Sequence, residues 1–284
     1  MSPASLSKRR TARTKPAPPV DTKADRTRST PEAVCRNITR VAKVGTCGFG
    51  LAKDAYARAF SCVEIQHTFY QPPQIRTLER WRSEMPAKFE FTIKAWQLIT
   101  HDAKSPTYRR LKRKLSETER REAGYFRATA IVKEAWETTL ASAKALKAKT
   151  ILFQCPASFK PSEENIASME KFFASIDRHD LNLCWEPRGG WDAKVVRSIC
   201  TGLQLWHVVD PFVCKSVTTD KCYFRLHGRN GWRYQYEPGE LAELAAALPK
   251  RKAGYVFFNN SKMTEDALRF CKILGARRAY GKTS

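Results

Sequence analysis

The sequence predicts a single TIM-type (β/α)8 barrel, an α/β fold, preceded by a disordered basic tail. Three observations lead to this fold class: a chain of 284 residues, eight short apolar runs, and helical patterns between most of those runs. One barrel of this type takes about 250 residues. Repeated alternation of strand and helix favours a parallel sheet, and eight units favour its closure into a barrel.

The apolar runs are nearly continuous, which is typical of strands buried on both faces of a parallel sheet. The first run is KVGTC and the last is YVFFN. We expect strands at about residues 43–47, 62–66, 89–94, 150–154, 182–186, 205–210, 222–227 and 255–259.

Helical patterns separate most of these strands. One of them opens with Ser162 just after Pro161, as a helix with an N-cap serine does. The sixth strand has no clear helical pattern after it, and we expect a loop from Pro211 instead. We expect helices at about residues 51–60, 75–83, 120–147, 162–176, 192–200, 240–248 and 264–274.

The composition divides the chain into a tail at 1–40 and a barrel at 41–284. The tail holds ten basic and three acidic residues, several prolines and few apolar residues. So sparse an apolar content does not offset the ordering entropy, which predicts disorder. An insertion at about 101–126 precedes the fourth strand. Its segment 104–121 holds eight basic and two acidic residues, and it is either a helical flap over a pocket or a solvated helix face.

The net charge is +23, from 51 basic and 28 acidic residues. A positive field of this size attracts polyanions, so we expect a nucleic acid or another polyanion as a partner. The competing interpretation is a basic surface that serves only solubility. The tail carries +7, so residues 41–284 still carry +16.

The chain has no run of about 18 apolar residues and no apolar secretory signal at its N-terminus, so we expect no membrane association. The nine cysteines form no C-x-x-C pair. We therefore predict reduced thiols, no disulfide framework and a cytoplasmic location. The Arg- and Ser-rich N-terminus also fits an organelle transit peptide.

Functional groups of a barrel come from the C-terminal ends of its strands. Nearly every expected strand carries a polar or charged residue near that end, although buried charge is costly unless it is paired. We predict catalytic roles for Glu64, Lys94, Glu186 and Asp210. We predict substrate-binding roles for Tyr70, Gln154, Trp185, Arg188, Arg225, His227, Asn259 and Asn260.

These residue types suggest acid–base chemistry on an anionic substrate. Glu64 and Glu186 could act as a general acid and base, as in a hydrolase or lyase that uses paired carboxylates. Lys94 and Arg225 could hold a phosphate or carboxylate, and a desolvated Lys94 could form a Schiff base. The competing interpretation is a set of structural ion pairs, such as Glu64 with Arg225.

Other chemistries have weaker support. Glu64, Glu186, Asp210 and His227 have the ligand types for a divalent cation. The chain has only five histidines and no HxH or HExxH pattern, so we predict no metal site, and no cofactor follows from the residues. Cys47 could be a thiol nucleophile, although such a cysteine is more often a packed strand end.

At these residues the chain resembles the domain-of-unknown-function 72 family, also called the YecE-like family. The similar stretches are VGTCGFG at 44–50, YARAFSCVEIQHTFYQPP at 56–73, LERWRSEMPAKFEFTIKAWQLITH at 78–101, LFQCPASF at 152–159, WEPRGGWD at 185–192, YFRLHGRNGW at 223–232 and YVFFNN at 255–260. The resemblance covers about residues 43–275 and implies a TIM-barrel fold. Cys47 stands where the family usually has the serine of a GxSxW motif.

Three functional hypotheses follow. The first is an enzyme that acts on a phosphate-bearing or nucleic-acid substrate through the carboxylate and cation pocket. The second is a nucleic-acid-binding protein without catalysis, which predicts a steep dependence of binding on salt. The third is a metabolic barrel that binds a small carboxylate or sugar.

Overall fold

A computed structural model of the chain describes residues 42–249 and 254–280, so the tail predicted at 1–40 lies outside the described residues. All eight expected strands are present, each within one residue of its expected bounds. They are β1 (Lys43–Thr46), β2 (Cys62–Ile65), β3 (Glu90–Lys94), β4 (Thr150–Gln154), β5 (Asn182–Glu186), β6 (Trp206–Val209), β7 (Tyr223–Leu226) and β8 (Tyr255–Phe258).

The strands form one parallel sheet in the order β1-β8-β7-β6-β5-β4-β3-β2. The two end strands of that order meet through a parallel bridge between Cys47 and Glu64. The amide of Gly48 also donates to the carbonyl oxygen of Glu64 at 2.8 Å. The sheet is therefore a nearly closed barrel, and the predicted fold class is confirmed.

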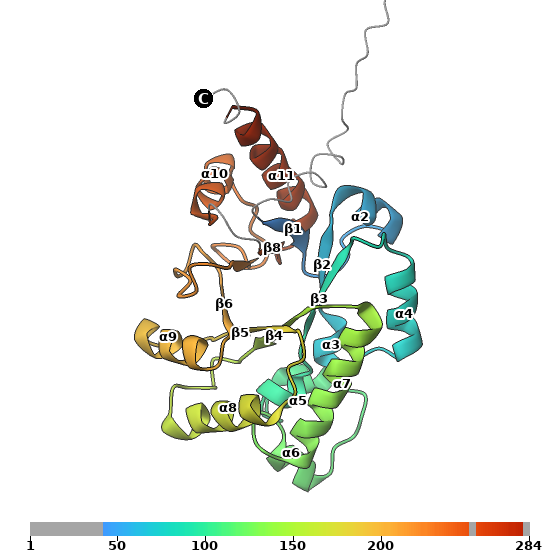
Figure 1. Ribbon diagram of the computed structural model, residues 1–284, viewed down its shortest axis with the longest axis vertical. Coiled ribbons are helices and arrows are strands. Elements are labelled where there is room, and N and C mark those ends of the chain that lie inside the picture. Colours follow the sequence, from blue (N-terminus) through green and yellow to red (C-terminus); the bar gives the residue numbers. More distant parts are fainter. Residues whose placement is uncertain (1–41, 250–253, 281–284) are drawn as a thin grey trace, which may run out of the picture.

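Helices surround the strands, as Figure 1 shows. They are α2 (Lys53–Ala59), α3 (His67–Tyr70), α4 (Ile75–Ser83), α5 (Gln97–Thr100), the 3-10 helix η1 (Pro106–Arg110), α6 (Glu117–Glu122), α7 (Ala130–Leu146), α8 (Glu163–Ser175), α9 (Ala193–Gly202), α10 (Pro238–Ala247) and α11 (Met263–Tyr280). Ser162 caps α8 by accepting from the Asn165 amide, as predicted. The segment from Asp210 to Cys222 contains no helix, which also agrees with the prediction.

The helix expected at 120–147 is wrong, because two helices, α6 and α7, share this stretch. Gly124 lies between them with a φ of +82°, and a Cβ at this position would lie 2.2 Å from the carbonyl oxygen of His101. Only glycine fits such a backbone conformation at such a close approach. The buried Phe126, also at positive φ, follows directly and anchors the break in the core.

The barrel interior takes every second residue of each strand, as the pleat requires. Its buried apolar cluster is Cys47, Cys62, Leu152, Cys184, Val208, Tyr223, Tyr255 and Phe257. Gly45 belongs to the same set, because a Cβ there would lie 2.3 Å from the carbonyl oxygen of Cys62. The same alternation continues towards the C-terminal ends of the strands, where it determines which polar side chains point into the mouth of the barrel.

The cysteines follow the sequence prediction with one exception. Among the residues that the structure describes, seven cysteines are free, and six of these seven are buried. Cys271 in α11 is disulfide-bonded, which the prediction of reduced thiols did not include. Within 42–249 and 254–280, no helix combines the length and the apolar character needed to cross a bilayer.

Candidate active site at the barrel mouth

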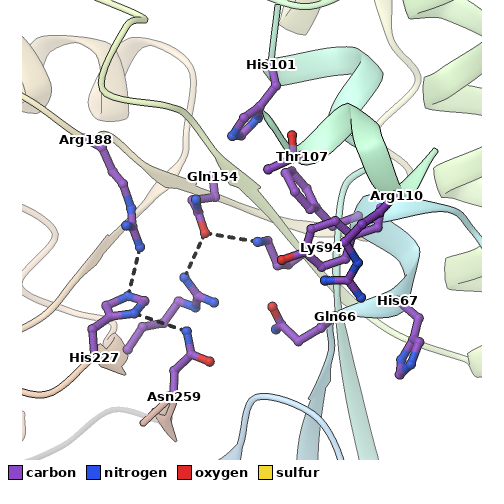
Figure 2. A pocket seen from close by; sticks show the side chains of 13 residues that line it. Gln66, His67, Lys94, His101, Thr107, Arg110, Gln154, Arg188, His227 and Asn259 are labelled. Atoms are coloured by element: carbon purple, nitrogen blue, oxygen red, sulfur yellow. Dashed lines mark hydrogen bonds between the residues drawn. The ribbon is translucent and has the colours of Figure 1, made fainter. Parts of the chain in front are cut away.

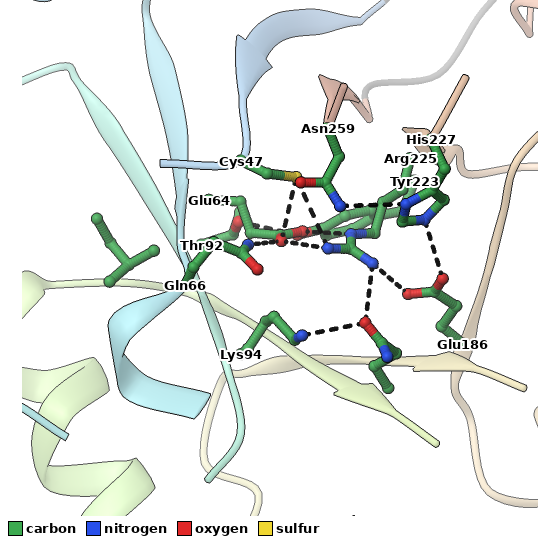
Figure 3. A network of polar contacts seen from close by, with 12 residues as sticks. Cys47, Glu64, Gln66, Thr92, Lys94, Glu186, Tyr223, Arg225, His227 and Asn259 are labelled. Atoms are coloured by element: carbon green, nitrogen blue, oxygen red, sulfur yellow. Dashed lines mark hydrogen bonds and ion pairs between the residues drawn. The ribbon is translucent and has the colours of Figure 1, made fainter. Parts of the chain in front are cut away.

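Arg225 of β7 stands at the centre of the barrel mouth and joins carboxylates from two distant strands. Its Nε and Nη2 donate to the two carboxylate oxygens of Glu64 at 3.0 and 2.9 Å, and its Nη1 donates to Glu186 Oε2 at 2.5 Å. Figure 3 shows this network across the barrel. The side chains of Arg225 and Glu64 are 1% and 0% exposed, so the pair is fully removed from water.

The carboxylate of Glu64 accepts hydrogen bonds from four neighbouring residues. Besides the two bonds from Arg225, it accepts from the Tyr223 hydroxyl at 2.7 Å, from the Gln66 amide, and from the Cys47 thiol at 3.3 Å. A carboxylate with this many donors is held in place. Burial and the neighbouring Glu64 charge raise the pKa of the Cys47 thiol well above its usual value. Cys47 is therefore not a thiolate nucleophile in this environment.

Glu186 of β5 lies beside Arg225 and faces His227. Burial alone would raise the pKa of Glu186, but the charge of Arg225, the hydrogen bond from His227 and the charge of Arg188 together hold it well below its usual range. Arg188 Nη2 donates to Glu186 Oε1 at 3.0 Å. Glu186 therefore stays ionised at neutral pH and cannot supply a proton.

His227 is oriented by its hydrogen-bonding neighbours. Its Nδ1 lies 3.1 Å from Asn259 Nδ2, and its Nε2 lies 3.3 Å from Glu186 Oε1 and 3.1 Å from Arg188 Nη2. Asp210 Oδ2 accepts from the backbone amide of His227 at 3.0 Å and thereby fixes the chain after β7. Figure 3 shows Asn259, His227 and Glu186 as one connected row.

Above this network opens a polar pocket of about 390 Å³. It is lined by Gln66, His67, Phe69, Tyr70, Lys94, His101, Thr107, Arg110, Gln154, Arg188, Arg225, His227 and Asn259. Figure 2 shows Lys94 between two groups, with Arg188 and His227 on one side and Arg110 and His67 on the other. Among the described residues, no carboxylate lines this pocket: Glu64 is fully buried and bonded to Arg225, and Glu186 lines the neighbouring cavity.

Lys94 is a buried amine at the floor of this pocket. Its Nζ donates to Gln154 Oε1 at 3.0 Å and lies 3.9 Å from the centroid of the Phe69 ring. Burial, followed by repulsion from Arg225, lowers the pKa of Lys94 to about 7 although Glu64 and Glu186 attract its charge. The Lys94 amine is therefore divided between its charged and neutral forms near neutral pH, which is the condition for proton transfer.

Several pocket residues escape prediction from the sequence. His101 follows α5, and burial together with the charges of Lys94 and Arg188 lowers its pKa to about 3, so this imidazole is neutral. Thr107 and Arg110 come from η1, within the basic insertion that the sequence marks as either a flap or a helix face. The insertion does reach the pocket, but as a 3-10 turn with Arg110 stacked 3.4 Å from the Tyr70 ring centroid.

Besides Glu64 and Glu186, three predicted site residues lie outside this pocket. Trp185 faces away from the barrel interior, fully buried, and its indole nitrogen donates to Cys155 Sγ at 3.2 Å. Asn260 is buried and donates to the Tyr234 carbonyl oxygen and to Asp266, both at 2.7 Å. Asp210 lines a neighbouring cavity of about 550 Å³, which Glu186 also lines. Arg188 and His227 line both this cavity and the pocket.

The carboxylates of Glu64 and Glu186 bind cationic side chains of the protein itself. Among the described residues, no group of three or more histidine, cysteine, aspartate or glutamate side chains has the spacing of a metal site. Both oxygens of Glu64 and of Glu186 already accept from protein donors, chiefly Arg225 and Arg188. These donors occupy the directions in which a cation would have to approach.

The fold and the site define a class: a parallel (β/α)8 barrel with a cation-lined pocket over a buried carboxylate–guanidinium network. The family model described as "Protein of unknown function DUF72" matches residues 52–283. The chain belongs to this family, as the sequence resemblance implied.

Relatives of this chain agree with the assignment. UPF0759 protein YunF of Bacillus subtilis (strain 168) is 23% identical over 245 residues, which are 73% of this chain and 79% of that protein. A crystal structure of a DUF72 family protein from Enterococcus faecalis superposes with a TM-score of 0.64 at 23% identity, over 83% of this chain and 98% of that one. A second, from Thermotoga maritima, gives 0.60 at 24% identity, over 82% and 99%. These likenesses support the fold alone.

Replacing Arg225 with methionine should strongly destabilise the protein. It would leave Glu64 and Glu186 buried without their shared cation, and breaking such a buried pair costs about 3–5 kcal/mol in free energy of unfolding. Arg188→Met is the matched control, because Arg188 is 40% exposed and also contacts Glu186. We expect the control to lose less than about 1 kcal/mol in urea denaturation. Equal losses in the two variants would contradict the central role of Arg225.

Replacing Lys94 with methionine should stabilise the protein near pH 7. The Lys94 pKa is about 7 in the folded protein and near its ordinary value of 10.5 in the unfolded chain. The unfolded chain therefore binds more protons between these values, and stability rises with pH across that window. We expect Lys94→Met to gain on the order of 2–4 kcal/mol at pH 7 and less at pH 9. Urea denaturation at both values tests this, and a less stable variant at pH 7 would refute it.

Proposed function

We propose that this protein is an enzyme that binds a phosphate-bearing substrate in the pocket at the barrel mouth and uses Lys94 to accept a proton. The observation that carries this proposal is the environment of Lys94: a buried amine with a pKa of about 7 that faces a pocket lined by cations. Its hydrogen-bond acceptor is the neutral amide of Gln154 rather than a carboxylate.

The charges around the pocket favour an anion. Lys94, Arg110, Arg188 and Arg225 line it, and no acidic side chain of the described residues does. Arg188 is 40% exposed and can present its guanidinium to a ligand, whereas Arg225 is committed to Glu64 and Glu186. Arginine binds phosphate and carboxylate groups in a fixed fork geometry, which orients the ligand.

The roles of the two predicted catalytic carboxylates change in this proposal. Glu64 is 0% exposed and does not line the pocket, and Glu186 is held ionised. We assign both to positioning: they hold Arg225 in place and moderate its repulsion of Lys94. Proton transfer then falls to Lys94, because a base with a pKa near the working pH combines the correct protonation state with a useful driving force.

The net charge of +23 extends the proposal to the partner. A field of this sign concentrates polyanions near the pocket, so nucleic acid is the phosphate-bearing partner that we propose. The cytoplasm supplies both nucleic acids and phosphorylated metabolites. Its reducing conditions fit the free cysteines of the barrel, whereas the disulfide-bonded Cys271 does not support this location.

Binding of a thymidine dinucleotide (TpT) tests the pocket, because its phosphodiester keeps a constant charge from pH 5 to 9. The affinity should fall as the pH rises through about 7, where Lys94 loses its proton. Lys94→Met should abolish this dependence, and Arg188→Met should weaken binding about tenfold or more. Lys171→Met, at an exposed position on α8, is the control. Calorimetry that finds the same affinity in Lys94→Met, Arg188→Met and the unchanged chain would exclude the pocket as the phosphate site.

Turnover tests the enzyme proposal directly. Nucleoside phosphate monoesters and diesters are incubated with the chain, and products are followed by mass spectrometry. We expect a rate at saturating substrate that rises with pH around an apparent pKa above 7, because the bound phosphate favours protonated Lys94. The rate should fall at least about 100-fold in Lys94→Met. Unfolding would not explain that loss, because the same variant should be the more stable one. Turnover by Lys94→Met at the original rate would overturn the role of Lys94.

A further inference from the structure

A second groove adjoins the pocket and is continuous with it. It has a volume of about 770 Å³ and lies between the chain after α3 and the insertion that contains η1. His67, Tyr70 and Arg110 line both the pocket and the groove. The backbone amide of Lys112 donates to Gln71 Oε1 at 3.1 Å, which ties the two walls together. A ligand could therefore pass from the groove into the pocket without leaving the protein surface.

The groove is basic, and part of its charge is free. Arg110 and Lys112 are exposed, and neither is ion-paired with a carboxylate in the part of the chain that the structure describes. Arg113 differs from them, because it pairs with Glu119 and Glu134 and so fixes the insertion against α6 and α7. Within 42–249 and 254–280, no acidic side chain lines the groove. Its free cations are therefore available to an anion.

The groove also offers flat surfaces. Trp81 of α4 is half-buried in its wall, with the exposed His67 ring against it at 5.7 Å. Tyr70 carries the Arg110 guanidinium on one face, and Arg110 itself is a planar group on which a base can stack. Alternating cations and aromatic planes along a groove are the features that bind single-stranded nucleic acid, because every base has a face to stack and every link a charge.

We propose that the groove binds a single strand of nucleic acid, so that one phosphodiester lies in the pocket near Lys94 and the adjoining nucleotides lie along Trp81, Arg110 and Lys112. This inference rests on the proposed function, since it names the substrate class of the same site. A compact phosphorylated metabolite would leave the groove empty, and the two paired bases of a duplex would not be free to stack on its aromatic groups.

The test compares a long and a short ligand. Fluorescence anisotropy measures binding of labelled dT12, and calorimetry measures binding of TpT, each over a salt series. Lys112→Glu changes a residue that lines the groove but not the pocket. Lys114→Glu is the matched control, because Lys114 is exposed two residues further along the same insertion and does not line the groove.

We expect dT12 to bind more tightly than TpT. Lys112→Glu should weaken dT12 binding at least tenfold and lower its salt slope by about 0.7 or more, the contribution of one single-strand phosphate contact. It should leave TpT binding within twofold, and Lys114→Glu should change either ligand by much less. Trp81→Leu should weaken dT12 binding in a way that salt does not change, because stacking is lost.

Three results would overturn the inference: equal affinities for dT12 and TpT, equal effects of Lys112→Glu and Lys114→Glu, or a 12-base-pair duplex that binds as tightly as dT12. In each case the pH dependence of TpT binding, and its loss in Lys94→Met, would still test the proposed function independently of the groove. Conversely, dT12 binding that depends on Lys112 and Trp81 but not on Lys94 would support the groove and contradict the pocket as the phosphate site.

Discussion

The site at the barrel mouth depends on the contact of Arg225 with Glu64 and Glu186. These carboxylates belong to β2 and β5, and a guanidinium from β7 reaches both, so three strands are held in one relative position. Removing such charges from water is costly, and only near-complete hydrogen bonding offsets that cost. The Tyr223 hydroxyl and the Gln66 amide supply the missing donors to Glu64. The site is therefore rigid before any ligand arrives, which is the property that catalysis by preorganised charge needs.

The properties of Lys94 follow from that contact. Arg225 repels the Lys94 ammonium while Glu64 and Glu186 attract it, and burial disfavours the charge in either case. Without Arg225 the pKa of Lys94 would be higher, and without the two carboxylates it would be lower. Burial and these three charges together bring the pKa to about 7. The network thus joins the stability of the fold to the chemistry of the pocket.

The sequence predicts the barrel well and the site in part. Both results follow from the alternation of inward and outward side chains along a strand, which has a period of two residues. Strands that are buried on both faces stand out in the sequence as apolar runs, so they can be found without a structure. Glu64, Lys94, Gln154, Glu186 and Arg225 all fall on inward positions of their strands, whereas Trp185 and Asn260 are one residue out of phase and face the surrounding helices or loops. Applying the alternation to every strand end would have removed both. His101, Thr107 and Arg110 come from a segment without periodicity, so only the three-dimensional structure brings them to the pocket.

The charges at the barrel mouth bear on the kind of ligand it can take. Glu64 is fully buried and bonded to Arg225, and Lys94, Arg188 and Arg110 line the open pocket. Glu186 bonds to the same Arg225 but lines the neighbouring cavity, so an anion that enters the pocket meets cations. The buried acids, which the sequence alone suggests as catalytic groups, therefore support the proposed anion site by holding Arg225 in the wall of the pocket.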